Sequence, residues 1–244
     1  MLNNSLWIGL CLAVGCGDQD HVAPDAAPSP TFTARIRGPL ASSLADSQSR
    51  HDGVAAQGKA QANAAGDFAH QVGLGTTDLG THLDEFLALD RWTDASGAQA
   101  FYADPNFQAE LGPLFSAAPS VDLYERRPDW AGWGQLDAGR LDAQPYWFVV
   151  IEGRLASTDR ETNHAAHDAI ASRAEAQARA AGDLAHLPHL AVGDDRTFFN
   201  VDVWNNEQGM LATFTSPDFQ AAFGSLFESP PDIRVYRSTD WYQW

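Results

Sequence analysis

The chain carries one sequence pattern twice, and this repeat limits its fold more than any other feature. In the first copy, Asp90-x-Trp92 precedes Pro105-x-Phe107-Gln108-Ala109 and Gly112-x-Leu114-Phe115. In the second, Asp202-x-Trp204 precedes Pro217-x-Phe219-Gln220-Ala221 and Gly224-x-Leu226-Phe227. Each matched residue lies 112 positions after its counterpart, as Trp204 does after Trp92, without a gap. A repeat of this length predicts two equivalent halves.

The repeat continues upstream at a different spacing. His51-Asp52 matches His167-Asp168, and Gly66-Asp67-x-Ala69-His70 matches Gly182-Asp183-x-Ala185-His186, now 116 positions apart. The first copy therefore has four more residues between its histidine and its tryptophan, which predicts a variable loop between two strands. We divide the chain into units 31–133 and 146–244, joined by a linker at 134–145.

The second unit is the easier one to interpret. Runs of β-branched and aromatic residues predict strands, and an Ala-rich stretch that stops at Gly182 predicts a helix with a glycine cap. The expected elements are a strand 146–151, a helix 164–181, strands 186–192 and 197–204, helices 207–214 and 219–227, and a strand 233–237. This βαββαβ order predicts an α+β fold of two tandem ferredoxin-like units, whose sheets pack face to face.

The first thirty residues are typical of an exported protein. Leu6 to Cys16 is an apolar run of signal-peptide length, too short to span a bilayer, and 17–30 is an Asp-, Ala- and Pro-rich tether. Val14-Gly15-Cys16 resembles the lipobox of bacterial lipoproteins, which implies lipidation of Cys16 and membrane attachment in the cell envelope; without lipidation the periplasm is expected. The alternative is an overcalled start codon before a cytosolic protein.

Charge and composition exclude several classes of function. A net charge of −17 over 244 residues would repel phosphate backbones, so no nucleic-acid partner is expected. Both cysteines, Cys11 and Cys16, precede the repeat, which leaves the units without a disulfide or a thiol nucleophile. The sequence also lacks a Gly-rich phosphate loop, a dinucleotide fingerprint and a zinc-protease helix. We therefore expect no cofactor.

The repeated segments resemble the antibiotic-biosynthesis-monooxygenase-like proteins of the dimeric α+β barrel superfamily. The resemblance rests on Val203-Trp204-Asn205-Asn206-Glu207-Gln208-Gly209, on Phe214-x-x-Pro217-x-Phe219-Gln220, and on their first-copy equivalents. It covers residues 31 to 244. Because such proteins are usually homodimers, the resemblance implies a monomer that acts as its own pseudo-dimer, forming an intrachain α+β barrel.

The strand Phe198 to Trp204 alternates between two faces. We expect one face, with Phe199, Val201 and Val203, to meet the helices. The other carries Phe198, Asn200, Asp202 and Trp204. These residues, with Asp90 and Trp92 of the first copy, suit the wall of a ligand pocket. A structural Asp–Trp pair at a sheet interface remains the alternative.

Histidines are the candidate bases. His70 and His186 each follow Gly-Asp-x-Ala at the start of a strand, and a neighbouring carboxylate would raise their basicity. His51 and His167 lie on the first helix of each unit and are weaker candidates. The preceding Asp67 and Asp183 suit a cap of the turn that follows the helix.

A metal site held by both units is excluded by the repeat. His164, His167, His186 and His189 could form one in the second unit, but Gly73 occupies the position equivalent to His189. We expect no metal. The paired tryptophans that end each unit, Trp130-x-x-Trp133 and Trp241-x-x-Trp244, are expected to pack on a core.

Three functions agree with these observations. The first is an exported protein that binds a small apolar or aromatic molecule and acts as a cofactor-free monooxygenase with His70 and His186 as bases, as the resemblance implies. The second is a non-catalytic binding or scavenging protein. The third is a haem-binding or haem-degrading protein, since a histidine can ligate iron.

Overall fold

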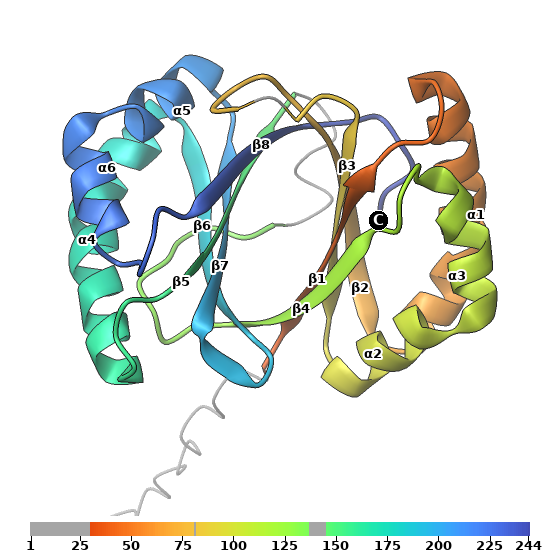
Figure 1. Ribbon diagram of the computed structural model, residues 1–244, viewed down its shortest axis with the longest axis horizontal. Helices are drawn as coiled ribbons and strands as arrows, with labels where there is room; N and C mark the ends of the chain where they lie inside the picture. Colours follow the sequence, from red (N-terminus) through yellow and green to blue (C-terminus); the bar gives the residue numbers. More distant parts are fainter. Residues whose placement is uncertain (1–29, 81, 137–144) are drawn as a thin grey trace, which may run out of the picture.

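Both halves of the chain fold into the same succession of elements (Figure 1). The computed structural model describes residues 30–80, 82–136 and 145–244, so the export segment, Cys16 and most of the linker lie outside the described residues. The first half contains β1 (Phe32–Pro39), α1 (Leu44–Ala64), β2 (Asp67–Gly75), β3 (Glu85–Trp92), α2 (Ala95–Ala103), α3 (Pro105–Leu111), a short 3₁₀ turn η1 (Gly112–Leu114) and β4 (Ser120–Arg126).

The second half repeats this order. It contains β5 (Trp147–Arg154), α4 (Arg160–Ala181), β6 (Asp183–Ala191), β7 (Asp194–Trp204), α5 (Glu207–Phe214), α6 (Pro217–Gly224) and β8 (Asp232–Ser238). Every element expected from the sequence of this half is present; α5 has the predicted bounds, and the other elements have shifted ends. The predicted cap is confirmed, because Gly182 ends α4 in the left-handed region at φ 112°.

The eight strands form one closed antiparallel barrel. Within each half the strands are ordered β4-β1-β3-β2 and β8-β5-β7-β6, and the halves join where β2 pairs with β8 and β4 pairs with β6. The predicted α+β barrel is confirmed, and the two sheets face each other across its interior. Their edges also hydrogen-bond at two seams, β2–β8 and β4–β6, which leaves no barrel strand with an unpaired edge.

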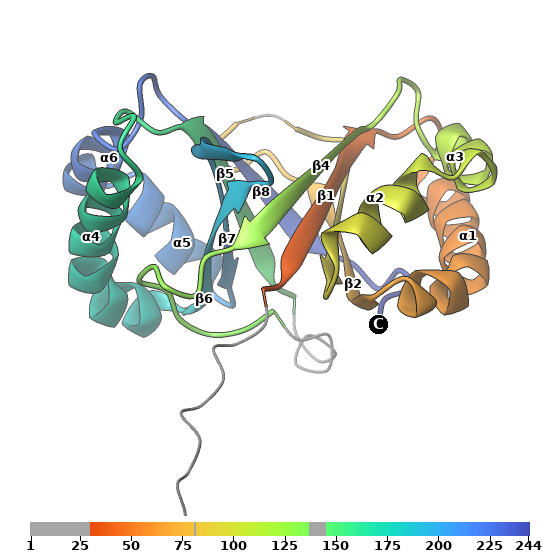
Figure 2. The same cartoon turned by 90° about the horizontal axis from the view of Figure 1, so that it is seen from below.

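The helices cover the outside of the barrel in two separate layers. Figures 1 and 2 show α1, α2 and α3 on one side and α4, α5 and α6 on the opposite side. The barrel interior contains aromatic and aliphatic side chains from both halves, including Leu87, Phe148, Phe199 and Tyr236, together with polar side chains such as the ion-paired Arg35 and Glu152. Each sheet is therefore buried on its inner face by the other half and on its outer face by its own helices.

The two faces of β7 are the reverse of the prediction. Phe199, Val201 and Val203 lie inside the barrel, whereas Phe198 and Trp204 pack under the helices with Met210 and Phe214 of α5. Alternation along the strand separates the two faces correctly, but both are buried, and the polar residues Asn200 and Asp202 lie under the helices with Phe198 and Trp204. Hydrophobicity alone therefore could not indicate which face meets the helices.

The C-terminal residues of each half cross to the other half. Trp241 packs in the core cluster of the first half, while Trp130 packs in that of the second. Figure 1 shows the C-terminus beside α1 and β2 accordingly. The predicted burial of these tryptophans is confirmed, and the core that each one completes belongs to the opposite half.

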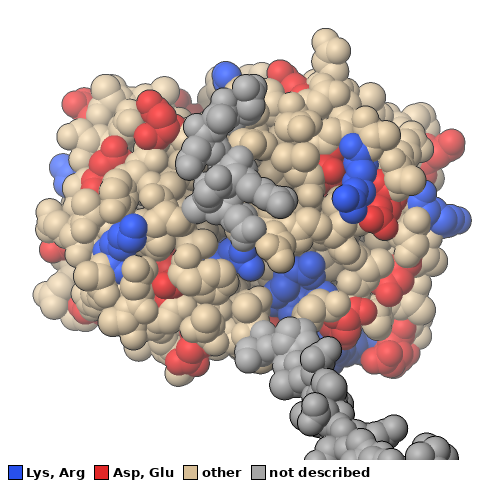
Figure 3. All heavy atoms as spheres, turned by 180° about the vertical axis from the view of Figure 1, so that it is seen from behind, with Lys and Arg blue, Asp and Glu red and all other residues tan. Residues whose placement is uncertain are grey.

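The outer surface has mixed charge. On the face shown in Figure 3, acidic and basic side chains are interspersed over both halves. In the described ranges, no helix combines the length and the apolar character that crossing a bilayer would require.

Candidate functional site

A β-bulge at the start of β2 brings Asp67 and His70 onto the same face of the sheet. The pairing of β2 with β3 shifts between Asp67 and Ala69, so that Asp67 lies opposite Trp92 and His70 opposite Asp90. Residues three apart in a regular strand point to opposite faces, and the extra residue removes this difference. The Asp67 carboxylate also accepts the Ala69 N–H at 3.1 Å, which confirms the predicted turn cap.

The second half repeats this arrangement at the start of β6. The register shifts between Asp183 and Ala185, His186 lies opposite Asp202, and Asp183 accepts the Ala185 N–H at 3.1 Å. The repeated Gly-Asp-x-Ala-His sequence thus encodes a helix cap, a buried carboxyl and a bulge that aims the histidine at the helices.

In the first half, two histidines and two carboxylates form a continuous chain. His70 Nδ1 lies 2.5 Å from Asp90 Oδ1, and His70 Nε2 lies 3.1 Å from His51 Nε2. At the other end His51 Nδ1 lies 3.0 Å from Asp52 Oδ1. The rings of His51 and His70 stack with centroids 5.2 Å apart, and both residues are buried. Helix α1 supplies His51 and Asp52, and strands β2 and β3 supply the other two.

The second half contains the equivalent chain. His186 Nδ1 lies 2.6 Å from Asp202 Oδ1, and His186 Nε2 lies 3.1 Å from His167 Nε2. His167 Nδ1 lies 3.0 Å from Asp168 Oδ1. The two halves therefore agree in all three contacts of this His–Asp series.

This geometry defines how many protons the histidine pair can hold. The three contacts of each pair need three N–H groups, because each contact uses one proton. Two neutral imidazoles supply only two. All three hydrogen bonds are therefore formed only when the histidine pair has gained one proton. When the pair is neutral, one of the three contacts lacks a hydrogen. The site is thus organised in advance to receive a proton.

A second positive charge is not accommodated near neutral pH. Burial and the positive charge of His70 lower the pKa of His51 to about 4. Burial and the charge of His186 likewise lower the pKa of His167 to about 4. His51 and His167 are therefore uncharged near neutral pH.

The bulge carboxyls carry a proton at neutral pH. Burial, and then the negative charge of Asp90, raise the pKa of Asp67 to about 8. Burial and the charge of Asp202 raise the pKa of Asp183 to about 9. Each half thus combines a buried carboxylic acid with a proton-accepting histidine pair, an arrangement suited to general acid–base chemistry.

The two halves differ in what else donates to the central carboxylate. In the first half the Tyr102 hydroxyl of α2 donates to Asp90 Oδ2. In the second half Phe214 occupies the equivalent position on α5, and the Asn200 amide donates to Asp202 Oδ1 at 2.8 Å. Ala88 stands where Asn200 would be in the first half. The donor therefore comes from a helix in one half and from the strand itself in the other.

Each site opens into a small cavity between the sheet and the helices. The first cavity, of about 40 Å³, is lined by His51, Asp67, His70, Asp90, Tyr102 and Trp244 among others. The second cavity is also about 40 Å³ and is lined by the equivalent His167, Asp183, His186 and Asp202, with Trp133 and Trp204. Such a volume holds a few water-sized molecules, since one water needs roughly 10–15 Å³.

The tail of the opposite half closes each cavity. Trp244 and His70 exchange backbone hydrogen bonds of 2.8 and 3.2 Å, and their rings stack with centroids 4.5 Å apart. Trp133 and His186 do the same at 2.9 and 3.1 Å, with centroids 4.8 Å apart. Neither cavity is therefore complete without both halves.

The structure brings most of the predicted site residues together. His70 and Asp90 line the first cavity, and His186, Asp202 and Trp204 line the second, where Asn200 lies buried beside Asp202. Trp92 packs against Phe101 and Tyr102 instead of lining the cavity. His51 and His167, the weaker candidates, prove to be integral to the chains.

Sequence reasoning missed the acidic role of Asp67 and Asp183 and the participation of Tyr102. The sequence predicts a carboxylate near each histidine and a turn cap at Asp67 and Asp183, and neither prediction reveals that these carboxyls are buried. Tyr102 lies within the gapless part of the repeat, but its counterpart is Phe214, so a search for residues shared by both copies passes over it.

The four histidines considered for a metal site in the second half do not converge. His189 lies inside the barrel, where its Nε2 is 2.9 Å from Thr33 Oγ1, whereas His167 and His186 face the helices. His164 contacts the backbone oxygen of Asp129 instead. Among the described residues, no three His, Cys, Asp or Glu side chains are placed to hold a metal ion.

The comparisons with known proteins identify the fold. No family model and no curated protein matches the chain. Among solved structures, an anthrone oxidase-like protein aligns over 89% of this chain and 94% of its own, with a TM-score of 0.61 and 14% identity. A candidate monooxygenase from Lactobacillus acidophilus aligns over 86% and 95%, with a TM-score of 0.55 and 11% identity.

A third similar structure is a heme-binding protein from Thermus thermophilus, aligned over 87% of this chain and 92% of its own with a TM-score of 0.52 and 11% identity. At such identities the likeness shows the fold alone. The chain is thus an α+β barrel protein of the kind found in these structures.

Proposed function

We propose that the chain binds a small apolar or aromatic molecule between sheet and helices and oxidises it with dioxygen, as a cofactor-independent monooxygenase of the antibiotic-biosynthesis-monooxygenase type. One observation carries the proposal: in each half a buried, hydrogen-bonded histidine pair lines the same cavity as a carboxyl whose pKa is raised by burial. The anthrone oxidase-like and monooxygenase-like neighbours support it.

The proposed reaction begins with proton abstraction. The histidine pair removes a proton from an activated C–H bond of the substrate, and Asp90 or Asp202 stabilises the charge that the pair acquires. The resulting carbanion reduces dioxygen and forms a C–O bond, which gives a peroxide anion on the substrate. Closing the cavity with Trp133 and Trp244 excludes bulk water that would reprotonate the carbanion.

The carboxyl then completes the oxidation. Asp67 or Asp183 donates its proton to the peroxide and afterwards accepts the second C–H proton, so that the O–O bond breaks and a carbonyl forms. The hydroxide that leaves takes the proton held by the histidine pair and becomes water. Overall a methylene and one dioxygen give a carbonyl and one water, without another oxidant or reductant.

We propose further that 31–133 and 146–244 are two ferredoxin-like units that act as a pseudo-dimer within a monomer. The shared strand order supports this, as does the exchange of the terminal tryptophans. Export, with lipidation of Cys16 and attachment to the cell envelope, or otherwise release into the periplasm, is also a proposal and rests on the sequence of the first sixteen residues.

Binding without catalysis is the second candidate. The carboxyls and imidazoles would then serve only to orient a polar group of the ligand in an otherwise apolar cavity. The contacts that occupy both nitrogens of both histidines in each half favour this candidate, because a base needs an unshared lone pair on one nitrogen.

Haem was tested as an occupant because of the heme-binding neighbour. Each cavity, of about 40 Å³, is far too small for a macrocycle. The site residues as arranged here do not fit haem.

Oxygen uptake tests the proposal. With anthrone as the probe, we expect one dioxygen to be consumed for each anthrone converted to the ketone. The double variant His70→Gln/His186→Gln should lose at least a hundredfold in rate, a typical contribution of a general base. Unchanged uptake in this variant would remove the proposed base, and the absence of uptake in the wild type would favour binding without catalysis.

His82→Gln is the matched control. His82 lies in the loop between β2 and β3 and lines neither cavity. Its replacement changes a histidine outside both sites, so we expect its oxygen uptake to equal that of the wild type.

A further inference from the structure

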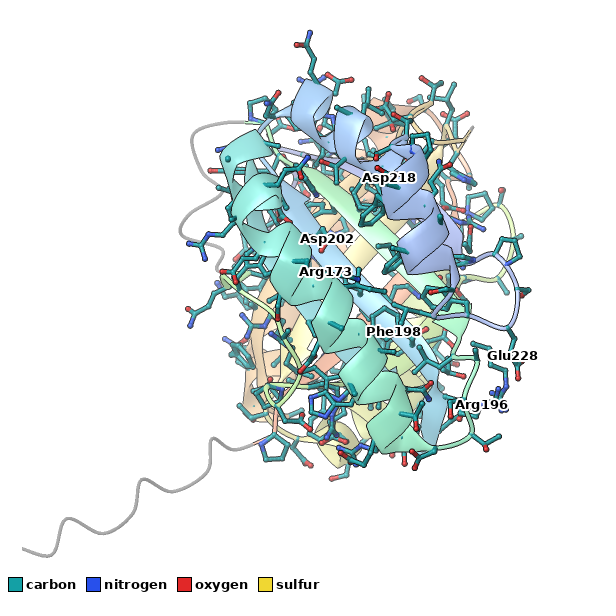
Figure 4. All side chains as sticks on the ribbon, turned by 90° about the vertical axis from the view of Figure 1, so that its left-hand side faces the viewer. Arg173, Arg196, Phe198, Asp202, Asp218 and Glu228 are labelled. Atoms are coloured by element: carbon teal, nitrogen blue, oxygen red, sulfur yellow. The ribbon has the colours of Figure 1, made fainter. Side chains whose placement is uncertain are left out.

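A groove leads from the surface of the second half to its cavity. It runs between α4 and the α5–α6 pair, measures about 390 Å³ and shares Ile170, Ala174, Ala178, Thr213 and Phe219 with the cavity beneath. In Figure 4, Arg173 of α4 and Asp218 of α6 mark its rim, and Asp202 lies on the strand behind. Its volume falls within the roughly 300–1,000 Å³ of small-molecule sites.

The cavity below the groove contains a hydrogen-bond donor without an acceptor. Trp204 lines the cavity and is only 1% exposed, yet its Nε1–H has no partner. A buried N–H that has lost its contact with water is costly unless an acceptor is supplied. An oxygen atom of a ligand entering from the groove would supply one.

The shape of the groove restricts the rest of the ligand. Alanines on α4 and α5, including Ala174, Ala178 and Ala212, leave space between the helices, and the Phe219 ring borders it. Small side chains on both walls and an aromatic edge suit a flat apolar molecule. The ligand class that meets both demands is a planar aromatic compound with a carbonyl or hydroxyl oxygen.

In the first half, a hydrogen bond between helix and strand opposes the entry of a ligand into the cavity. The Tyr102 hydroxyl ties α2 to Asp90 on β3, and burial and the charge of Asp90 hold the pKa of Tyr102 far above its usual value, so that it stays a donor. Phe214 cannot form this bond, and Asn200 satisfies Asp202 from within the strand. The helix over the second cavity is therefore not fastened to the site by a hydrogen bond.

We propose that the two halves have diverged: the groove admits a planar oxygen-bearing aromatic ligand to the second cavity, while the hydrogen bond from Tyr102 to Asp90 holds α2 over the first cavity and opposes entry there. The inference rests on the proposed function for the choice of ligand. The ring occupies the groove, its oxygen accepts the Trp204 N–H, and the space of about 40 Å³ below is left for a molecule of the size of dioxygen.

Binding of 1-naphthol under anaerobic conditions tests this proposal. Titration calorimetry should give one site per chain. Ala212→Trp fills the groove and should weaken binding at least tenfold, whereas Ala100→Trp, at the equivalent exposed position of α2, should leave it unchanged. Two equal sites in the wild type, or equal losses in both variants, would overturn the proposal.

Grafting the second-half arrangement onto the first half provides a gain of function. Tyr102→Phe/Ala88→Asn replaces the helix tether by a strand donor, and we expect the number of 1-naphthol sites to rise from one to two. A folded double variant, verified by its circular dichroism, that still binds one equivalent would contradict the role of Tyr102.

The binding test is independent of turnover. One site blocked by Ala212→Trp, with no oxygen uptake from anthrone, would support the groove and refute the oxygenase. Oxygen uptake that Ala212→Trp leaves intact would support the oxygenase and refute the groove.

Discussion

Opposite pKa shifts of buried residues make the stability of the fold depend on pH. The pKa values of Asp67 and Asp183 are raised to about 8 and about 9, so the folded chain binds more protons there than the unfolded chain at any pH between about 4 and these values. Their effect is a loss of stability as pH rises. The pKa values of His51 and His167 are lowered to about 4, and their effect between pH 4 and 6.5 is a gain.

The two effects oppose each other below pH 6.5, and only the carboxyls act above it. We therefore expect the free energy of unfolding to fall between about pH 6.5 and 9. The double variant Asp67→Asn/Asp183→Asn, whose amides keep the acceptor for the Ala69 and Ala185 N–H groups, should show a flatter profile. Urea unfolding at several pH values measures this, and an equally steep fall in the variant would contradict the raised pKa values.

Tyr102 in the first half and Asn200 in the second each donate a hydrogen bond to the central aspartate. We therefore expect an asparagine at position 88 to compensate for the loss of the Tyr102 hydroxyl. Tyr102→Phe leaves one oxygen of the buried Asp90 without its donor and should cost about 1–3 kcal/mol of stability. Adding Ala88→Asn installs the donor that the second half uses and should recover most of this loss. Denaturant midpoints of both single variants and the double variant give the coupling, and additive effects would show that the two donors are not equivalent.

At the scale of elements, the sequence predicted what is local and missed what is tertiary. The ends of α5 and the Gly182 cap follow from residues adjacent in the chain. The outward face of β7 does not, because both faces are buried and the polar residues Asn200 and Asp202 point to the helices instead of to solvent. The bulge that turns Asp67 towards His70 was also hidden, since its register shift depends on pairing with β3.

The last residues of each half pack on the opposite half. A destabilising substitution there should therefore loosen the half that does not contain it. Trp241→Ala removes a buried ring from the core of the first half and should cost about 3–5 kcal/mol. Trp130→Ala removes the equivalent ring from the second. In hydrogen exchange we expect Trp241→Ala to expose α1 and β2, and Trp130→Ala to expose α4 and β6. Loss of protection confined to the half that contains the substitution would contradict the crossing.

At the scale of the whole molecule, the closed barrel turns two units into one cooperative structure. Each seam pairs only three residues of one half with three of the other, whereas pairs within a half extend over six to eight residues. The seams are thus the weakest part of the barrel. They are also what distinguishes a monomer from a swapped oligomer, because an open seam exposes two strand edges that another chain can pair with.

Gly73 offers a way to open one seam. A Cβ atom at this position on β2 would lie 2.9 Å from the Tyr236 Cβ and 3.1 Å from the Phe148 ring, so that β8 must move away. We expect the wild type to sediment as a 26.4 kDa monomer and Gly73→Ala to form dimers or larger species. Gly53→Ala, whose Cβ meets nothing within 4 Å, is the matched control and should stay monomeric. A monomeric Gly73→Ala of unchanged stability would mean that the β2–β8 seam does not control assembly.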